Sequence, residues 1–278
     1  GLGALPRIED GRGRYVEYAK TTIPTGMSLE GLKVVIDCAN GAAYKVAPKV
    51  LWELGAEVVP MGATPNGKNI NDGCGATATQ ALQERVVAEK ADVGIALDGD
   101  ADRLILVDQN GARVDGDQLM AVIARDWAER GLLKGNGVAA TVMSNLGFER
   151  FLKSLDLTLE RTAVGDRYVV ECMRETGMNL GGEQSGHMVL SDFSTTGDGL
   201  LAALQILAIM KRSDMDVARL CHVFETVPQI LENVRIDGLL AKDVMDNPDV
   251  KQAISDAQDN LNGSGRVLVR PSGTEPLI

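Results

Sequence analysis

The chain has 278 residues, more than one domain usually contains, so its length predicts two or three α/β-sized units. Its 28 lysines and arginines stand against 39 aspartates and glutamates, and the net charge of −11 argues against nucleic acid or an anionic membrane as a partner. The four cysteines form no CxxC pair, which argues against a zinc site or a disulfide framework and favours a cytoplasmic protein with reduced thiols.

Strand-like and helix-like segments alternate from residue 32 onward. Apolar runs of strand length are followed by longer amphipathic runs that end at glycine or lysine, which is typical of βα units. The first group of predicted elements comprises strands 32–39, 56–61 and 91–97 and helices 40–55 and 76–90.

Residues 103–116 predict two short strands around Asn110-Gly111, a strong hairpin signal. Asp117 is expected to cap the following helix, which ends at Gly131. The pattern then restarts, with predicted strand 137–143, helix 146–155 capped by Ser144, strand 157–164, helix 166–177, an interrupted strand 179–192 and an apolar helix 197–212.

This alternation predicts an α/β fold with two consecutive α/β sandwich domains, each with a mixed sheet between helices. We expect these domains at residues 12–112 and 113–220, preceded by residues 1–11 as a linker or the end of a further domain. Residues 221–278 predict a truncated α+β domain. Its expected elements are strands 229–236 and 265–270 and helix 249–261.

Three aspartates, Asp98, Asp100 and Asp102, occupy alternate positions directly after the buried strand 91–97. The carboxyl ends of strands are where open α/β sheets bind ligands. Three carboxylates in one small volume suit Mg²⁺, and Arg103 beside them would add the guanidinium that often accompanies Mg²⁺ in phosphoryl transfer. A solvated acidic turn is the alternative interpretation of the same residues.

An EF-hand is a second alternative for this loop, because its positions 1, 3 and 5 would all be aspartate. The pattern fails at position 6, where Arg103 replaces glycine, and at position 12, where Gln109 replaces the bidentate glutamate. We therefore reject the EF-hand interpretation.

Two further loops carry polar groups that suit a phosphorylated sugar. Residues 181–187 (GGEQSGH) present Glu183, Ser185 and His187, and the first two could hydrogen-bond neighbouring sugar hydroxyls. Residues 269–276 (VRPSGTEP) combine a glycine, two hydroxyls and a guanidinium, the donors that bind phosphate. Ordinary polar turns are the alternative for both loops, and neither contains a Walker A motif.

The loops that could bind a metal, a sugar and a phosphate are called here the metal loop, the sugar loop and the phosphate loop. They occur in this order on successive α/β units, and together they resemble those of the α-D-phosphohexomutase superfamily. Within it the loops are most similar to those of the bacterial phosphoglucosamine mutases. The segments that carry the resemblance are DGDADRLILVD (98–108), VGDRYV (164–169), GGEQSGH (181–187), RPSGTEP (270–276), DCANGAAY (37–44) and TTGDGLLAALQ (195–205).

The resemblance implies roles for the residues of these loops. Asp98, Asp100 and Asp102 would bind Mg²⁺, and Arg103 would be the catalytic residue that stabilises the transferred phosphoryl group. The residues expected to bind substrate are Glu183, Ser185 and His187 at the sugar, Arg270, Ser272, Gly273 and Thr274 at the non-reacting phosphate, and Asp166 and Arg167 from a third loop.

The implied reaction moves phosphate between O6 and O1 of glucosamine phosphate, with glucosamine 1,6-bisphosphate or glucose 1,6-bisphosphate as intermediate or activator. Members of the superfamily carry a phosphorylated serine in a T-A-S-H-N-P-like segment, and these 278 residues contain no such segment. We therefore expect the chain alone to be inactive. Phosphomannomutase/phosphoglucomutase activity and non-catalytic binding of a sugar phosphate are the alternatives, and a homodimer is left open.

Overall fold

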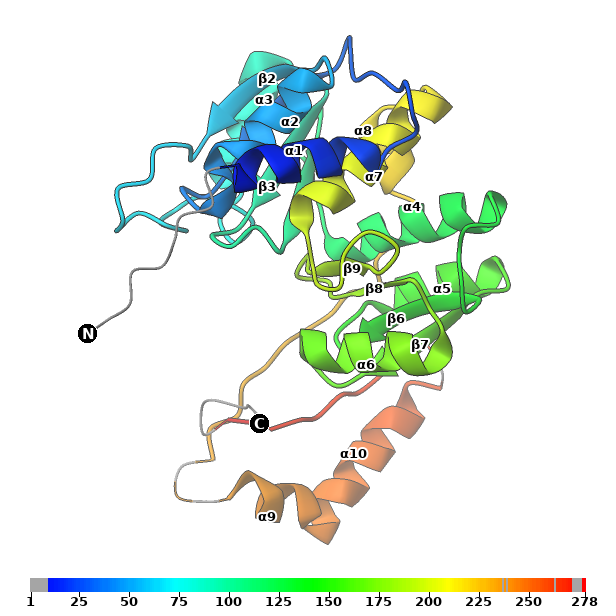
Figure 1. The fold of residues 1–278 in the computed structure, drawn as a ribbon. Helices are drawn as coiled ribbons and strands as arrows, with labels where there is room; N and C mark the ends of the chain where they lie inside the picture. The colour runs from blue at the N-terminus through cyan, green and yellow to red at the C-terminus, as the bar shows by residue number, and fades with distance from the viewer. Residues whose placement is uncertain (1–9, 237, 239, 263, 272–276) are drawn as a thin grey trace, which may run out of the picture. The chain divides into compact units, whose positions relative to one another are not determined.

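The computed structural model describes residues 10–236, 238, 240–262, 264–271 and 277–278 (Figure 1). The chain divides into two compact units. One comprises the described residues up to 144 together with 148–224, and the other comprises 145–147 together with the described residues from 225 onward. The first unit contains both β-sheets of the described chain, the metal loop at 98–103 and the sugar loop at 181–187, whereas the phosphate loop belongs to the second unit.

The first sheet is mixed, as predicted, with strand order β2-β1-β3-β4-β5. Its parallel strands are β1 (Lys33–Asp37), β2 (Glu57–Met61) and β3 (Val93–Leu97), and its antiparallel strands are β4 (Leu104–Asp108) and β5 (Arg113–Val114). β3 and β4 are buried on both faces, which explains their continuous apolar sequences. Leu97 pairs with Leu104, so residues 98–103 connect two adjacent strands.

Helices cover both faces of this sheet because alternate strand residues point in opposite directions. Val34 and Ile36 belong to the main core with α1 (Gly11–Thr21) and α2 (Val46–Glu53), whereas Val35 packs with α3 (Gln80–Glu89). The predicted helix 40–55 is split, with a 3₁₀ turn at Ala42–Tyr44 before α2, and the predicted helix 76–90 begins only at Gln80.

The second sheet is also mixed, with strand order β7-β6-β8-β9. β6 (Gly137–Thr141) is parallel to both β7 (Thr158–Thr162) and β8 (Leu180–Gly182), and β9 (Met188–Leu190) is antiparallel to β8. α6 (Asp166–Thr176) packs on one face of this sheet through Val169 and Met173.

α7 (Gly199–Ser213) connects the two sheets within the first unit. It contacts β3 and β4 of the first sheet and β9 of the second, and it also packs against α4 (Gly116–Glu129). All of its residues from Gly199 to Met210 are therefore buried, which explains why the apolar run is not amphipathic. Figure 1 labels α7 and the short helix α8 (Val217–Cys221) that follows it in the chain. The remaining helix of this region is α5 (Leu146–Ser154).

Two local predictions about helix caps are wrong. Asp115, not Asp117, caps α4, and its carboxylate accepts a hydrogen bond of 3.2 Å from the amide of Gln118. Asp117 is fully buried within the first turn. Asn145 rather than Ser144 takes the cap position before α5, where its Oδ1 accepts a 2.8 Å bond from the amide of Gly147.

Of the elements predicted for the C-terminal domain, the structure forms the helix but not the two strands. The described residues of the second unit form α9 (Ala241–Asp246) and α10 (Pro248–Asn260), and the predicted helix 249–261 corresponds to α10. Neither 229–236 nor 265–270 forms a strand; within the described residues the unit shows only an isolated antiparallel bridge between Arg235 and Leu277. Ile230 is 88% exposed and Leu231 75% exposed, so these apolar residues lack the neighbouring strands that would bury them.

None of the helices in the described part of the chain combines the length and apolar character that a membrane span requires. The domain boundaries proposed from the sequence stay predictions.

Candidate functional site

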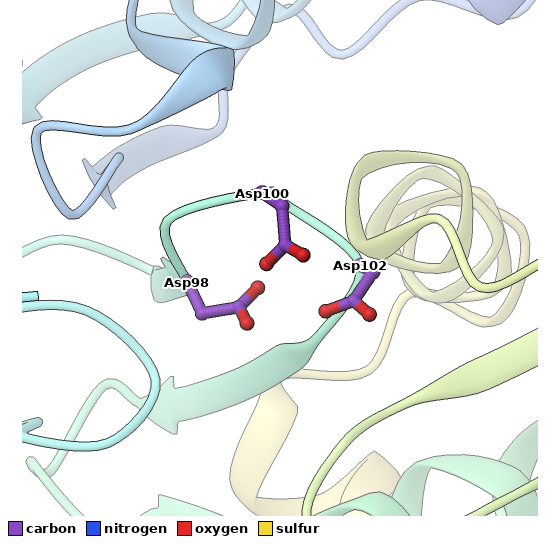
Figure 2. A group of neighbouring side chains, drawn as sticks. All are labelled: Asp98, Asp100 and Asp102. Atoms are coloured by element: carbon purple, nitrogen blue, oxygen red, sulfur yellow. The ribbon is translucent and has the colours of Figure 1, made fainter. Parts of the chain in front are cut away.

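The three aspartates converge on one small volume at the carboxyl end of β3 (Figure 2). One carboxylate oxygen each from Asp98, Asp100 and Asp102 lie within 4.8 Å of one another. Asp98 is buried and Asp100 is exposed, while Asp102 lies between these extremes. Ala101 has a positive φ of 64°, and this left-handed turn allows the chain to reverse between the second and third aspartates.

The electrostatics of this loop are unfavourable without a cation. Burial above all, together with the negative charges of Asp102 and Asp100, raises the pKa of Asp98 to about 6. A 3.1 Å hydrogen bond from the amide of Arg103 to Asp98 Oδ1 opposes this shift. The guanidinium lies farther away, with Arg103 Nε 3.8 Å from Asp98 Oδ2. A divalent cation would relieve the repulsion among these carboxylates.

A second observation, on Asp102, also indicates that these residues fit Mg²⁺. Asp102 Oδ1 is buried and accepts no hydrogen bond from any described residue. Leaving a carboxylate oxygen buried without a partner is costly, and a cation at the meeting point of the three side chains would satisfy it. Hard oxygen ligands in this number are those that Mg²⁺ prefers. The loop can therefore hold Mg²⁺ while leaving coordination positions for phosphate oxygens.

We expect Mg²⁺ binding to weaken as the pH falls through about 6, because a proton on Asp98 then competes with the metal. The apparent Kd should rise about tenfold per pH unit well below this pKa. In the metal-free protein the pH dependence has the opposite direction. The folded state holds this proton more tightly than the unfolded chain does, so the contribution of Asp98 to the free energy of unfolding falls as the pH rises from about 4 to about 6. Thermal unfolding with and without Mg²⁺ at pH 5 and pH 7 measures both effects. A Mg²⁺-induced rise in Tm that is equal at both pH values would contradict this.

His187 lies against the metal loop. Its Nδ1 is 3.0 Å from Asp102 Oδ2, its side chain is 7% exposed, and its Nε2 is buried without a hydrogen-bond partner among the described residues. An isolated antiparallel bridge joins Arg103 to His187, and the amide of Leu104 donates to the carbonyl of Gly186 at 2.9 Å. The end of the sugar loop is therefore hydrogen-bonded directly to the metal loop. The predicted contact between His187 and a sugar stays a prediction.

The remaining sugar-loop residues form a tight turn. Ser185 Oγ donates to Glu183 Oε2 at 3.2 Å, and the amide of Gly165 donates to Glu183 Oε1 at the same distance. Glu183 thus links the sugar loop to the start of α6, where Asp166 and Arg167 lie. Ser185 is exposed. The structure brings this loop together with the third predicted loop, and their substrate contacts stay predictions.

The side chains of Asp166 and Arg167 both form hydrogen bonds within α6. Asp166 Oδ1 accepts from the amide of Arg167 at 2.7 Å, and Arg167 Nε donates to Glu171 Oε1 at 2.8 Å. The Arg167 side chain is 79% exposed, so this ion pair contributes little stability and the guanidinium is accessible to a ligand.

The phosphate loop belongs to the second unit. Arg270 is exposed there, and Ser272, Gly273 and Thr274 lie outside the described residues. Their predicted role in phosphate binding therefore stays a prediction.

Sequence reasoning missed the residues that support the metal loop from below. Asp37, fully buried at the end of β1, accepts hydrogen bonds from the amides of Ala39 at 2.9 Å and Gly75 at 2.7 Å. The loop that follows packs against the metal loop, and the amide of Ala42 donates to the carbonyl of Gly99 at 2.8 Å. A buried aspartate that ends an apolar strand was the available signal.

The segment CGATA (74–78) packs against the end of β3, where the metal loop begins. The amide of Ala76 donates to the carbonyl of Leu97 at 2.9 Å, directly before the first aspartate. A Cβ on Gly75 would lie 2.5 Å from that carbonyl oxygen, so the segment approaches the strand end closely.

Comparison with known proteins identifies three successive domains of one family. Residues 13–111 match phosphoglucomutase/phosphomannomutase α/β/α domain II, residues 115–227 match α/β/α domain III, and residues 231–278 match the C-terminal domain. A phosphoglucosamine mutase from Sinorhizobium medicae is 61% identical over 277 residues, covering 100% of this chain. The chain spans 61% of the length of that relative.

Solved structures have the same fold. An N-acetylphosphoglucosamine mutase from Aspergillus fumigatus, in complex with GlcNAc-6P and magnesium, matches 99% of this chain and 63% of its own with a TM-score of 0.75 at 21% identity. A variant of the A. fumigatus enzyme in complex with glucose 1,6-bisphosphate matches 97% of this chain and 61% of its own with a TM-score of 0.70 at 21% identity.

The described fold agrees with these matches in its two mixed sheets between helices. The motifs that first suggested the resemblance lie within the three matched domains. The chain therefore belongs to the phosphoglucomutase/phosphomannomutase family of the α-D-phosphohexomutase superfamily, from which it carries domains II, III and the C-terminal domain.

Proposed function

We propose that the protein is a phosphoglucosamine mutase that interconverts glucosamine 6-phosphate and glucosamine 1-phosphate through a bisphosphate intermediate. The observation that carries the proposal is the convergence of Asp98, Asp100 and Asp102 beside Arg103, with His187 bonded to the same loop. The contact between His187 and Asp102 supports the proposal because it places the proposed metal site beside the loop proposed to bind the sugar. The 61% identity to a protein named phosphoglucosamine mutase supports the choice of sugar.

In this proposal the three aspartates hold Mg²⁺, which when bound supplies positive charge to the transferred phosphoryl group. Arg103 supplies further positive charge from the same loop. Its Nε is buried without a hydrogen-bond partner among the described residues and lies 3.8 Å from Asp98 Oδ2. A donor left in this state can turn to phosphate oxygens without breaking an existing hydrogen bond, which favours stabilisation of developing charge.

Glu183 and Ser185 are proposed to bind the sugar, because a carboxylate accepts and a hydroxyl both donates and accepts hydrogen bonds from neighbouring ring substituents. Their mutual hydrogen bond of 3.2 Å orients both side chains before substrate arrives. Arg270, Ser272, Gly273 and Thr274 are proposed to bind the phosphate that is not transferred, with Asp166 and Arg167 contributing from α6. The intermediate has to turn end for end, so these groups must bind either phosphate.

Glucosamine 1,6-bisphosphate or glucose 1,6-bisphosphate would be the intermediate or activator, and the partner is a small phosphosugar. The proposal places the protein in the cytoplasm, which is supported by four free cysteines at positions 38, 74, 172 and 221. A homodimer is compatible with it.

Fusing the chain to the part of the S. medicae relative that it does not match tests the function. We expect the fusion to convert glucosamine 6-phosphate to glucosamine 1-phosphate, followed by ³¹P NMR, with lower kcat/KM on glucose and mannose phosphates. The 278-residue chain alone should be inactive, because the two-step transfer needs a phosphoserine segment that it does not contain.

Each alternative predicts a different result in this assay. Preferred turnover of mannose or glucose phosphate would assign phosphomannomutase/phosphoglucomutase activity instead. A folded fusion that binds glucosamine 6-phosphate in calorimetry without converting it would indicate a non-catalytic binding protein. Activity of the unfused chain would overturn the proposed need for the serine segment.

A further inference from the structure

The metal loop depends on a backbone conformation that its own sequence does not favour. Ala101, between Asp100 and Asp102, has φ of 64°, in the left-handed region that alanine rarely adopts. Its amide donates to the carbonyl of Asp98 at 3.1 Å, which closes the turn. The turn aims the Asp102 carboxylate back toward Asp98, so the conformation of Ala101 determines whether the three carboxylates meet.

The first residue of α7 holds this turn from outside the loop. The amide of Gly199 donates to the carbonyl of Ala101 at 2.9 Å. A Cβ on Gly199 would lie 2.4 Å from the carbonyl oxygen of Arg103, so the helix start fits directly against the loop. The first amides of a helix have no partners within the helix, and here one of them binds the strained residue of the metal loop.

Asp198 and Tyr15 fix the start of α7. Asp198 caps the helix, and its Oδ1 accepts from the amide of Leu201 at 2.9 Å. The Tyr15 hydroxyl lies 3.0 Å from Asp198 Oδ1 and 2.9 Å from Oδ2, and it donates to this carboxylate. Tyr15 lies on α1, so two elements 183 positions apart in the sequence meet at this carboxylate. The hydroxyl prevents the capping side chain from rotating away.

We propose that Tyr15 and Asp198 are positioning residues for the metal site, acting through Gly199 on the left-handed turn at Ala101. Neither residue touches the metal or the substrate in this proposal. The inference rests on the proposed metal role of the loop and adds a support that reaches it from the first helix. Loss of the Tyr15 hydroxyl loosens the helix start, which frees Ala101 to leave its strained conformation and separates the carboxylates.

Binding of Mn²⁺ to the 278-residue chain, followed by electron paramagnetic resonance with competition by Mg²⁺, tests the proposal without any need for turnover. Tyr15→Phe should weaken Mn²⁺ binding by roughly three- to tenfold, the loss expected for one hydrogen bond. Tyr18→Phe is the matched control: it removes a hydroxyl of the same helix that bonds to the carbonyl of Phe193 instead of Asp198. This control should bind Mn²⁺ as the wild type does.

A second variant keeps the test decisive if Tyr15→Phe does not fold, as judged by circular dichroism. Asp198→Asn retains an oxygen to cap α7 but offers the Tyr15 hydroxyl only one acceptor atom. It should also weaken Mn²⁺ binding. A purely structural role would lower Tm in both variants and leave the Mn²⁺ affinity of the folded protein unchanged, which would overturn the proposal.

An Ala101→Gly background distinguishes a positioning role of Tyr15 from a general loosening of the fold. Glycine adopts the left-handed conformation without strain, so in an Ala101→Gly background the Tyr15→Phe change should weaken Mn²⁺ binding by less than about twofold. Lys90→Gly is the control: Lys90 also has a positive φ, of 51°, but lies at the end of α3. In that background the full effect of Tyr15→Phe should remain.

The outcomes distinguish this inference from the proposed function. If the wild-type chain binds Mn²⁺ and the Tyr15→Phe variant binds it equally well, only the positioning role is overturned. An equal loss from Tyr15→Phe with and without Ala101→Gly also overturns it. Failure of the wild-type chain to bind Mn²⁺ at all overturns the metal assignment on which both proposals rest.

Discussion

Asp100→Ala in the active fusion is expected to abolish mutase turnover, with kcat lower by at least roughly a thousandfold. Asp100 is the exposed member of the three aspartates, and its carboxylate accepts no hydrogen bond from the described residues. Its removal therefore takes away a proposed metal ligand without breaking a structural contact. Loss of one of three neighbouring negative charges also relieves repulsion, so the metal-free variant should be at least as stable as the wild type.

Steady-state turnover of glucosamine 6-phosphate, Mn²⁺ binding and thermal unfolding of the same preparation measure these effects. Asp156→Asn is a matched control, because it also removes one negative charge from an exposed aspartate, and asparagine tolerates the positive φ of 56° at that position. It should leave all three quantities unchanged. Retention of a tenth or more of the wild-type kcat by Asp100→Ala would exclude a metal role for the loop.

Gly41→Ala is expected to displace the metal loop. A Cβ at position 41 would lie 2.2 Å from the carbonyl oxygen of Gly99 and 2.6 Å from its Cα, which is far inside contact distance. Both atoms belong to backbone that cannot rotate out of the way, so the loop or its support has to shift. The backbone of Gly41 is extended, with φ of −103°, so the effect comes from the clash and not from an unfavourable conformation.

We expect Gly41→Ala to lose roughly 1–3 kcal/mol of folding free energy, as overpacked sites do. A shift of the aspartates by about 1 Å should lower kcat on the order of a hundredfold. Chemical denaturation and the mutase assay of the fusion measure the two effects. Gly13→Ala is the control, since a Cβ there meets no atom within 4 Å. If Gly41→Ala binds Mn²⁺ and turns over as the wild type does, the support of the metal loop by residues 41 and 42 is refuted.

Local patterns in the sequence were sufficient for most of the elements in the first unit. The apolar run before Asp98 predicted β3, Asn110-Gly111 predicted the turn between β4 and β5, and alternating βα units predicted mixed sheets covered by helices. The spacing of the aspartates predicted their convergence because a turn after a strand brings alternate residues together. Each of these inferences depends on residues close in the chain.

The C-terminal strands show where local patterns fail. Residues 229–236 have the length and the apolar residues that suit a strand, yet a strand forms only when a neighbour supplies backbone hydrogen bonds, and the described residues provide one isolated bridge. Asp117 likewise has the residue type of a helix cap, but Asp115 is the residue whose backbone is extended and whose carboxylate reaches the free amide.

The sequence by itself determined which groups the candidate site contains: three carboxylates, an arginine and a loop predicted to face the sugar, in a fixed order. Only the tertiary structure decided what surrounds them. It brought His187 within hydrogen-bond distance of Asp102, 85 positions away, and Tyr15 within hydrogen-bond distance of Asp198, 183 positions away. No periodicity links such residues, because hydrogen bonds between distant segments follow from how sheets and helices pack, and that packing is set by the apolar contacts of the whole core.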